Sequence, residues 1–138
     1  MTITRDQFVL SDETQMFDVA AIAALVRGAY WGGQRTTEQV AESLTHSTCL
    51  VLTSQGETIG FVRAISDHSV NSYICDFIVS PRYQQQSLGS WMLETLMAHP
   101  SLVRTTQLLV TKDAMAFYEK HGFAQHPWVF MRRPKGLG

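Results

Sequence analysis

One stretch of this sequence limits the possible folds more than any other: an apolar strand that leads through a polar loop into an amphipathic helix. Residues 73–79 are apolar on both faces apart from Asp76, a pattern typical of a central strand that is covered on both sides. Pro81 ends this strand. After a polar run, apolar residues recur at helical spacing from Leu88 to Leu96, until His99-Pro100 stops the helix. The chain is therefore expected to place helices on a sheet.

The rest of the chain alternates between helical and strand-like segments, which predicts a mixed α/β order. Asp18 is a suitable N-cap for a helix through residue 29, and a second helix is expected after Thr36 or Thr37. Asp113 would cap a short helix that ends at Gly122, a residue suited to a left-handed C-terminal position. The expected strands are residues 8–10, 49–53, 58–65, 73–79, 107–110 and 128–132.

No internal repeat or linker divides the chain, so one domain over residues 1–138 is expected. Its fold class would be α/β (α+β), with a mixed central sheet of about six strands and helices on both faces. The tail from about residue 133 is expected to be flexible.

The composition narrows the class of protein. With 45% hydrophobic and 17% charged residues, the chain can form a core, and intrinsic disorder is excluded. A net charge of −1 argues against nucleic-acid binding, which needs a basic face. The longest apolar run, residues 19–26, is far shorter than a membrane span, and the N-terminus lacks the pattern of a signal peptide. These features predict a cytoplasmic protein with no membrane or nucleic-acid partner.

The cysteine and histidine patterns support neither a metal site nor a covalent nucleophile. Cys49 and Cys75 lie in apolar, strand-like segments and are expected to be buried free thiols. Neither has a histidine in a recognisable catalytic arrangement, and the histidines show no ligand spacing. No bound metal is therefore expected.

The polar loop before the helix at residue 88 is a candidate anion site. The first amides of a helix have no partner within the helix, and the helix dipole favours negative charge there. Gly89 and Ser90 keep the side chains small, so that a phosphate can approach the backbone. Taken alone the signal is weak, because most strand-to-helix turns bind nothing.

Two motifs resemble those of the GNAT (GCN5-related N-acetyltransferase) superfamily. Its first motif reads V-x-P-x-[YH]-[RQ]-x-x-G-x-[GA], and the residues that match it are Val79, Pro81, Tyr83, Gln84 and Gly89. Residues 110–123 resemble the second motif, a strand followed by an A-x-x-[FL]-Y-x-x-x-G-F helix. Both motifs stand in the family's order and separation, and the resemblance covers nearly the whole chain. It implies the GNAT fold.

The N-terminal half is similar to a subgroup of small bacterial GNAT proteins with a Y-W-x-x-x-R-x-x-E pattern. Tyr30, Trp31, Arg35 and Glu38 match that pattern. Tyr30, Trp31 and Arg35 are candidates for the lining of the acceptor pocket, with the planar fork of Arg35 binding an acceptor carboxylate. An equally open alternative places Trp31 in the core where the two helices meet.

The resemblance implies transfer of an acetyl group from acetyl-CoA to the primary amine of a small-molecule or amino-acid-like acceptor, by direct attack in a ternary complex. Tyr118 would protonate the departing thiolate, since the pKa of a phenol, about 10, is not far above that of a thiol. The backbone of residues 77–79 would pair with the pantetheine arm, and the helix start would hold the pyrophosphate. The residues expected to bind coenzyme A are Phe77, Ile78, Val79, Gln84, Gln85, Gln86, Ser87, Leu88, Gly89, Ser90, Asp113 and Tyr118.

Asp76 is the first candidate for the base that removes a proton from the acceptor ammonium, or for a residue that binds and orients the acceptor. Burial in an apolar strand disfavours the charged form of a carboxylate, which makes a buried carboxylate a stronger base. The alternative is a structural ion pair with Arg63 on the neighbouring strand, and the sequence does not separate the two. His68 is a weaker candidate that would act through water, and a surface turn is the simpler account of that residue.

One position departs from the family pattern. Ser87 stands where the family usually has glycine, and its Cβ disfavours both a positive φ and a close approach of the backbone to a ligand. Either the loop accepts serine with ordinary dihedral angles, its hydroxyl adding a phosphate donor, or the cofactor is bound more weakly and activity is reduced.

Two other hypotheses therefore stand beside the active enzyme. One is a module that binds acyl-CoA as a sensor or partner without turnover, and the other is an acetyltransferase that acts on a protein amine. A homodimer that pairs through an exposed final strand is compatible with the sequence pattern but is not required by it.

Overall fold

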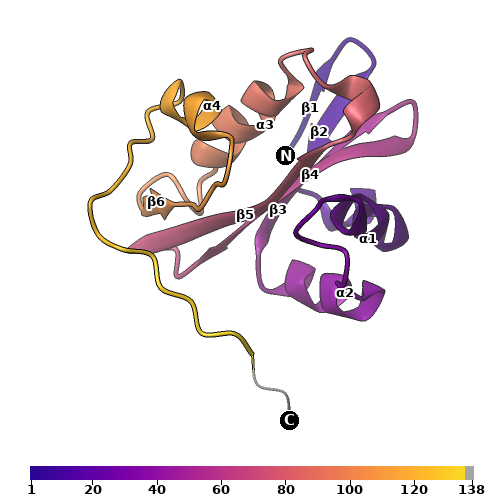
Figure 1. The fold of residues 1–138 in the computed structure, drawn as a ribbon. Coiled ribbons are helices and arrows are strands. Elements are labelled where there is room, and N and C mark those ends of the chain that lie inside the picture. Colours follow the sequence, from indigo (N-terminus) through magenta and orange to yellow (C-terminus); the bar gives the residue numbers. More distant parts are fainter. Residues whose placement is uncertain (136–138) are drawn as a thin grey trace.

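The computed structural model describes residues 1–135, which form one six-stranded sheet with its strands in sequence order (Figure 1). The strands are β1 (Thr2–Arg5), β2 (Phe8–Ser11), β3 (Thr48–Ser54), β4 (Glu57–Ser66), β5 (Asn71–Val79) and β6 (Thr106–Leu108). Neighbouring strands from β1 to β5 are antiparallel, whereas β5 and β6 run parallel. The expected mixed sheet of six strands is confirmed.

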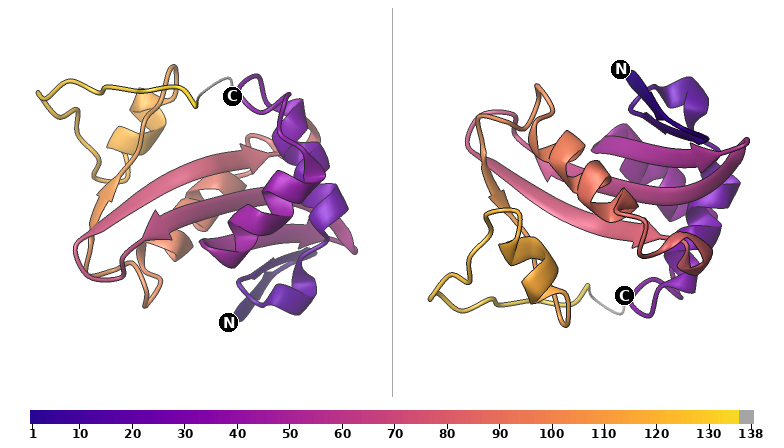
Figure 2. Two further views of the ribbon diagram at one scale, coloured as in Figure 1. Left: turned by 90° about the horizontal axis from the view of Figure 1, so that it is seen from below. Right: turned by 90° about the horizontal axis from the view of Figure 1, so that it is seen from above.

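Helices cover both faces of the sheet, as expected (Figure 2). The helices α1 (Val19–Gly28) and α2 (Thr37–Thr45) pack on one face, and α3 (Leu88–Met97) packs on the other. The short α4 (Met115–Glu119) lies beside α3, while the 3-10 helices η1 (Thr14–Met16) and η2 (Pro81–Tyr83) precede α1 and α3. No helix in this part of the chain has the length and apolar character needed to cross a lipid bilayer.

Local sequence explains where several elements begin and turn. Asp18 is the N-cap of α1, and its carboxylate accepts a backbone N–H of the first turn at 3.1 Å. Thr36 opens α2 with a capping box that it forms with Gln39. Gln55-Gly56, which connects β3 to β4, has positive φ at both residues, as the favoured two-residue hairpin turn requires.

The expected final strand was wrong, because residues 128–132 pair with no strand among the residues that the structure describes. We call these residues the C-terminal arm. The arm crosses β5 in projection in Figure 1, but the views of Figure 2 separate the two. Trp128 is 82% and Met131 87% exposed. The sequence of the arm has strand propensity, but propensity does not decide whether an edge is within reach.

The sixth strand of the sheet is instead β1, an edge strand that was not among the strands expected from the sequence. It forms a hairpin with β2 that turns at Asp6, whose φ is 52°. All residues of β1 are exposed, so that no buried apolar residues mark this edge strand in the sequence.

The N-cap of α4 differs from the one expected from the sequence. The expected cap by Asp113 was wrong: Ala114 is the N-cap position, and Thr111 Oγ1 accepts the Ala114 N–H at 3.0 Å. Gly122 has a φ of 91°, which confirms the left-handed turn after this helix. Of the tail expected to be flexible, residues 136–138 lie outside the described part of the chain.

Candidate active site

A β-bulge in β5 opens the sheet toward β6. In the pairing with β4, the register shifts so that Asp76 and Phe77 face a single residue, and Asp76 has a left-handed φ of 52°. β5 pairs with β6 only from Asn71 to Tyr73. Beyond that point the two strands separate, and within residues 1–135 no strand occupies this side of β5. Such an open edge can pair with any chain that carries amide groups.

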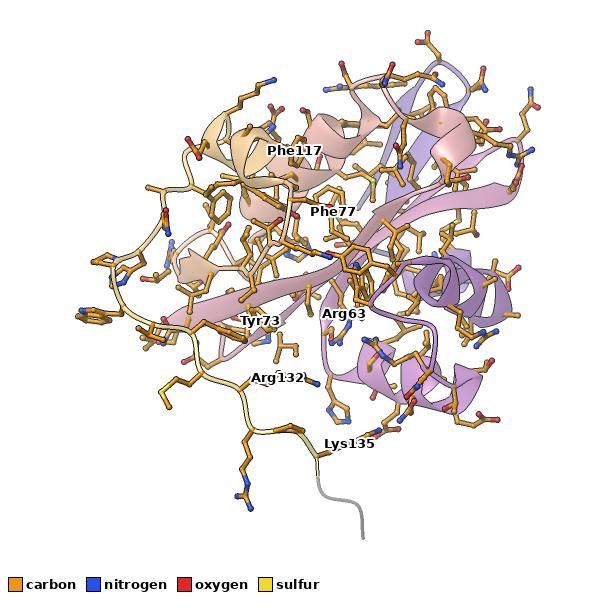
Figure 3. All side chains as sticks on the ribbon, in the orientation of Figure 1. Arg63, Tyr73, Phe77, Phe117, Arg132 and Lys135 are labelled. Atoms are coloured by element: carbon orange, nitrogen blue, oxygen red, sulfur yellow. The ribbon has the colours of Figure 1, made fainter. Side chains whose placement is uncertain are left out.

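The bulge also changes the faces to which the side chains of β5 point. Ile74, Phe77 and Val79 pack into the core on the α3 side, whereas Ile78 packs into the core on the α1 side. In Figure 3, Phe77 points toward α4, and Arg63 lies on the side of the sheet that α1 and α2 cover. The bulged strand therefore has the aromatic side chain of Phe77 on the side of α3 and α4, whereas the charged side chain of Arg63 lies on the side of α1 and α2.

Two arginines hold Asp76. Arg63 Nε lies 2.6 Å from Asp76 Oδ2, and Arg35 Nη1 and Nη2 lie 2.9 and 3.4 Å from Oδ2 and Oδ1. The side chains of Asp76 and Arg63 are 6% and 12% exposed, and that of Arg35 is 27% exposed. Arg63 Nη1 also donates to Ser47 Oγ at 3.0 Å. The ion pair between Arg63 and Asp76 is thus present, and Arg35 joins it.

Arg63 and the two cysteine thiols beside it are buried, and burial affects the pKa of each group. Burial is the largest single influence on Arg63 and lowers its pKa, but the hydrogen bond to Asp76 and the charges of the neighbouring groups together outweigh burial and raise the pKa of the guanidinium. Cys49 and Cys75 flank Arg63 on the neighbouring strands. Burial raises the pKa of Cys49 to about 12 and that of Cys75 to about 11. Thiols with these pKa values stay protonated at neutral pH and are poor nucleophiles.

The loop between α1 and α2 carries three expected pocket residues, and of these Arg35 joins this cluster. The Arg35 guanidinium lies 5.9 Å from the Trp31 ring, and Lys112 Nζ lies 5.2 Å from the Tyr30 ring. Tyr30 is 70% and Trp31 40% exposed, so that Trp31 is not a core residue. The fork of Arg35 holds the protein's own carboxylate, Asp76, and binding of an acceptor carboxylate by Arg35 stays a prediction.

Gly32 fixes the path of this loop. A Cβ at Gly32 would lie 2.1 Å from the backbone oxygen of Val26, whereas the nearest atom to a Cβ at Gly33 would be 3.9 Å away. Gly32→Ala is therefore expected to lower the free energy of unfolding by about 1–3 kcal/mol, the range for overpacked positions. Gly33→Ala, the matched control, should change it much less. Urea denaturation measures both, and equal losses in the two variants would contradict this account.

The start of α3 presents free backbone amides. The first bond into the helix runs from the Trp91 N–H to the Ser87 carbonyl at 3.2 Å. The N–H groups of Leu88, Gly89 and Ser90 have no acceptor among residues 1–135. These amides and the helix dipole together suit an anion.

Ser87 adopts a left-handed conformation, with φ 61° and ψ 15°, and makes no side-chain cap. The alternative in which the loop accepts serine with ordinary dihedral angles was therefore wrong. Gln85, with φ 65°, is left-handed as well. The steric cost of a Cβ in this region is roughly 1–2 kcal/mol. The loop thus keeps a conformation that glycine adopts more easily.

Ser87→Gly is expected to raise the free energy of unfolding by about 1 kcal/mol, because the steric cost disappears while the greater backbone entropy of glycine offsets part of the gain. Ser80, with φ −51°, is the matched control. Ser80→Gly removes no strain and should lower stability by about 0.5–1 kcal/mol. Opposite signs in urea denaturation support this account of the loop, and a loss in both variants speaks against it.

The helix α4 lies over the open half of β5. The Phe77 ring centroid is 6.0 Å from that of Phe117 and 6.4 Å from that of Tyr118, and Figure 3 shows Phe77 and Phe117 pointing toward one another. Burial raises the pKa of Tyr118 above its ordinary value. His121 Nε2 lies 3.1 Å from Ser90 Oγ. Phe77 of the open strand thus contacts Tyr118, and His121, which follows α4, contacts Ser90 in the first turn of α3.

Two expected residues lie apart from this arrangement. His68 occupies the turn between β4 and β5 with a left-handed φ of 61°, and its Nδ1 lies 3.3 Å from the Ser101 carbonyl oxygen. Asp67 Oδ1 accepts three backbone N–H groups in the same turn, and these bonds lower its pKa. This is the surface turn that was the simpler account of His68. Asp113 is exposed just before α4.

Sequence reasoning missed three polar contacts of the site. They are Ser47 with Arg63, Lys112 with Tyr30, and His121 with Ser90. Each pair is far apart in the chain, so that no local pattern indicates it. The only available signal was that Lys112 and His121 lie inside the second motif.

The comparisons with known proteins concern the same part of the chain. The family model described as an acetyltransferase (GNAT) domain matches residues 45–125, which include β5, α3 and Tyr118. The uncharacterized N-acetyltransferase ycf52 of Porphyra purpurea is 29% identical over 101 residues, which cover 68% of this chain and 58% of that protein. The chain therefore spans less than two thirds of the length of this curated relative.

Solved structures share the arrangement of strands and helices. A GNAT-family structure from Xanthomonas campestris pv. campestris has a TM-score of 0.84 and 26% identity, over 94% of this chain and 95% of that chain. An aminoglycoside 6'-N-acetyltransferase complexed with coenzyme A has a TM-score of 0.56 and 17% identity, over 63% of this chain and 52% of that chain. At this lower identity the likeness concerns the fold alone.

Proposed function

The chain belongs to the GNAT acetyltransferase family, and on that premise we propose that it transfers an acetyl group from acetyl-CoA to the primary amine of a small-molecule or amino-acid-like acceptor. The two substrates react by direct attack within a ternary complex. The observation that carries the proposal is the bulge of β5, which leaves a strand edge open beside Tyr118 and near the free amides of α3.

The residues around the bulge fit coenzyme A as a ligand. Acetyl-CoA supplies the acetyl group in activated form, as a thioester. The open backbone of Phe77, Ile78 and Val79 offers N–H and C=O groups to the amide groups of the pantetheine arm. The amides of residues 88–90, at the positive end of the helix dipole, suit the pyrophosphate. The fold neighbour that was solved with coenzyme A supports this use of the fold.

The loop before α3 is shaped for the same ligand. Gln84 Nε2 donates to the Val79 carbonyl oxygen at 3.2 Å, which ties the loop to the end of β5. Gln85 and Ser87 are both left-handed. Successive amides in such turns form concave anion sites, so residues 84–87 extend the cradle that the helix start provides.

Tyr118 acts as the general acid in this proposal. As the amine nitrogen attacks the carbonyl carbon, the C–N bond forms, the C–S bond breaks, and the sulfur takes the phenolic proton. The ammonium acceptor gives up two protons in all: one passes to solvent before the attack, and the other, released as the amide forms, restores the phenolic proton of Tyr118. Because burial raises the pKa of Tyr118, the phenol stays protonated at neutral and mildly alkaline pH.

Asp76 orients the acceptor rather than removing its proton. Oδ2 of Asp76 accepts hydrogen bonds from both Arg35 and Arg63, and Oδ1 accepts one from Arg35, so that two cations hold the carboxylate and one position on Oδ1 remains for an acceptor group. One carboxylate and two guanidinium groups leave a net positive charge. This charge favours an acceptor that carries an anionic group near its amine, with Tyr30 and Trp31 as aromatic contacts.

A second candidate function, binding of acyl-CoA without turnover, is favoured by one observation. Ser87 keeps a left-handed conformation at the expected phosphate site, where its Cβ restricts how closely a ligand approaches the backbone. Weaker cofactor binding and slow turnover would follow from this restriction.

Two measurements test the proposal. Calorimetric titration with acetyl-CoA is expected to show saturable binding below millimolar concentration, within the usual range for enzyme substrates. A thiol-release assay over a panel of amines, including amino acids and short peptides, is then expected to show turnover above hydrolysis for an amino-acid-like amine. Binding without turnover points to the sensor, and turnover with peptide amines alone points to a protein acceptor. Absence of binding at millimolar acetyl-CoA overturns both functions.

A further inference from the structure

Two consecutive aromatic residues in the loop between α1 and α2 each hold a cation from a different part of the chain. Lys112 belongs to the connection between β6 and α4, and its Nζ lies 5.2 Å from the centroid of the Tyr30 ring. The Arg35 guanidinium lies 5.9 Å from the centroid of the Trp31 ring. A cation within about 6 Å of a ring centroid is attracted by the quadrupole of the ring. The two rings therefore bring two positive charges to one loop.

The open half of β5 lies between the two segments that carry these cations. From one side, Arg35 contacts Asp76 at the bulge. From the other side, α4, which follows the connection with Lys112, packs on Phe77, the next residue of β5. The contact between Tyr30 and Lys112 thus joins the two segments that flank the open edge.

Both cationic groups have binding capacity that the described part of the chain does not use. No carboxylate of residues 1–135 forms an ion pair with Lys112, and a ring attracts a cation without neutralising its charge. Asp76 takes two of the five N–H donors of the Arg35 side chain, which leaves three. Arg35, Arg63 and Asp76 together carry one net positive charge, and Lys112 adds a second. The site therefore offers a ligand two separate cationic groups.

We propose that Lys112 is a specificity-determining residue that binds a second anionic group of the acceptor, and that the preferred acceptor is an amino dicarboxylate. This inference rests on the acetyl transfer proposed above. Asp76 Oδ1, which accepts one hydrogen bond, from Arg35 at 3.4 Å, receives the amine of the acceptor. One carboxylate binds the remaining donors of Arg35, and the other binds Lys112 Nζ. The reactive free amine of a dicarboxylate carries two negative charges, which match the two positive charges of the site.

Acceptor preference measures the role of Lys112. Asparagine and glutamine replace the second carboxylate of aspartate and glutamate with a neutral amide of nearly the same shape. The parent enzyme is expected to have a kcat/KM about tenfold higher for one dicarboxylate than for its matched amide, the effect of a hydrogen bond between charged groups. Lys112→Met should abolish this preference, and Lys112→Arg should keep most of it. Lys120→Met is the matched control, because Lys120 is exposed at the C-cap of α4 and the variant makes the same change in net charge.

Variants of Tyr30 test whether the ring positions Lys112. Tyr30→Ala is expected to lower the preference for the dicarboxylate as Lys112→Met does, whereas Tyr30→Phe keeps the ring and should keep the preference. The double variant Tyr30→Ala with Lys112→Met should lose no more than Lys112→Met alone, because both changes remove one contact. Additive losses would assign Tyr30 a contribution of its own and contradict its positioning role.

Calorimetric titration of the coenzyme A complex with the same four amino acids gives the preference as a ratio of dissociation constants, with or without turnover. An equal ratio in the parent and in Lys112→Met, an equal loss in Lys120→Met, or no binding of either dicarboxylate overturns the inference. Turnover of any amine in the panel then leaves the proposed function in place. A dicarboxylate that binds through Lys112 but is not acetylated instead overturns the proposed function and supports the binding role of Lys112.

Discussion

Tyr118→Phe is expected to lower kcat for acetyl transfer about 100-fold, at the lower end of what loss of a general acid does. The ring remains, and with it the packing against Phe77, Phe117 and Phe123 at 6.4, 5.1 and 5.8 Å. Only the phenolic proton donor is lost, so that affinity for coenzyme A should change little. Thiol-release kinetics and calorimetric titration with coenzyme A measure the two quantities separately.

Tyr73→Phe is the matched control, because Tyr73 is a second tyrosine near β5–β6, 40% exposed, whose pKa is also raised by burial. It lies at the last β5–β6 pair, outside the bulge, and its variant should keep kcat. An acid fails as pH rises through its pKa, and burial raises the pKa of Tyr118 above 10.0. Tyr118 should therefore cause no fall in kcat between about pH 7 and 9. A Tyr118→Phe variant with kcat within a factor of about three of the parent would remove Tyr118 from the mechanism.

The elements with strong local signals were predictable from the sequence. The cap at Asp18 and the capping box at Thr36 are local hydrogen-bonding devices, and the structure has both. β5 was predictable because it is apolar on both faces. β1 was not predictable, since all of its residues are exposed and its pairing depends on β2 alone. The strand predicted at residues 128–132 was wrong for a related reason: its residues suit a strand, but strand propensity does not decide whether a sheet edge is within reach.

The sequence motifs indicated candidate site residues, whose roles stay predictions, but they did not indicate the contacts between them. The motifs placed Tyr118 and the loop before α3 in one site, and the structure connects them through His121 and Ser90. The pairing of Arg35 with Asp76 joins residues 41 positions apart, and only the tertiary fold sets such a pair. The left-handed backbone of Ser87 could not be predicted from the sequence either. Serine prefers a negative φ, and only the contacts of the surrounding loop impose a positive one.

Asp76→Asn is expected to lower the free energy of unfolding by about 3–5 kcal/mol, the range for breaking a buried ion pair by removing one partner. Asparagine has nearly the same shape, but it leaves two guanidinium groups facing one another without the charge between them. Arg63 has no easy access to water, with a side chain only 12% exposed. Urea denaturation measures the loss. Asp18→Asn is the matched control, because asparagine caps a helix as well as aspartate does and the change should stay small.

The kinetics of the folded Asp76→Asn protein separate orientation from proton removal. A base works only when it is deprotonated, so a base at this position gives the parent enzyme an acidic limb in kcat that the variant lacks. An orienting residue instead leaves the shape of the pH profile of kcat unchanged, and its loss raises KM for the acceptor by about tenfold.

Arg35→Lys is the second variant in which KM for the acceptor is measured. It keeps the positive charge but loses the planar fork that holds Asp76 at 2.9 and 3.4 Å. Because Arg35 is the more exposed arginine, at 27%, this variant should raise KM with little loss of stability. A raised KM in both variants with an unchanged pH profile assigns Asp76 and Arg35 to acceptor positioning, whereas loss of the acidic limb in Asp76→Asn alone makes Asp76 the base.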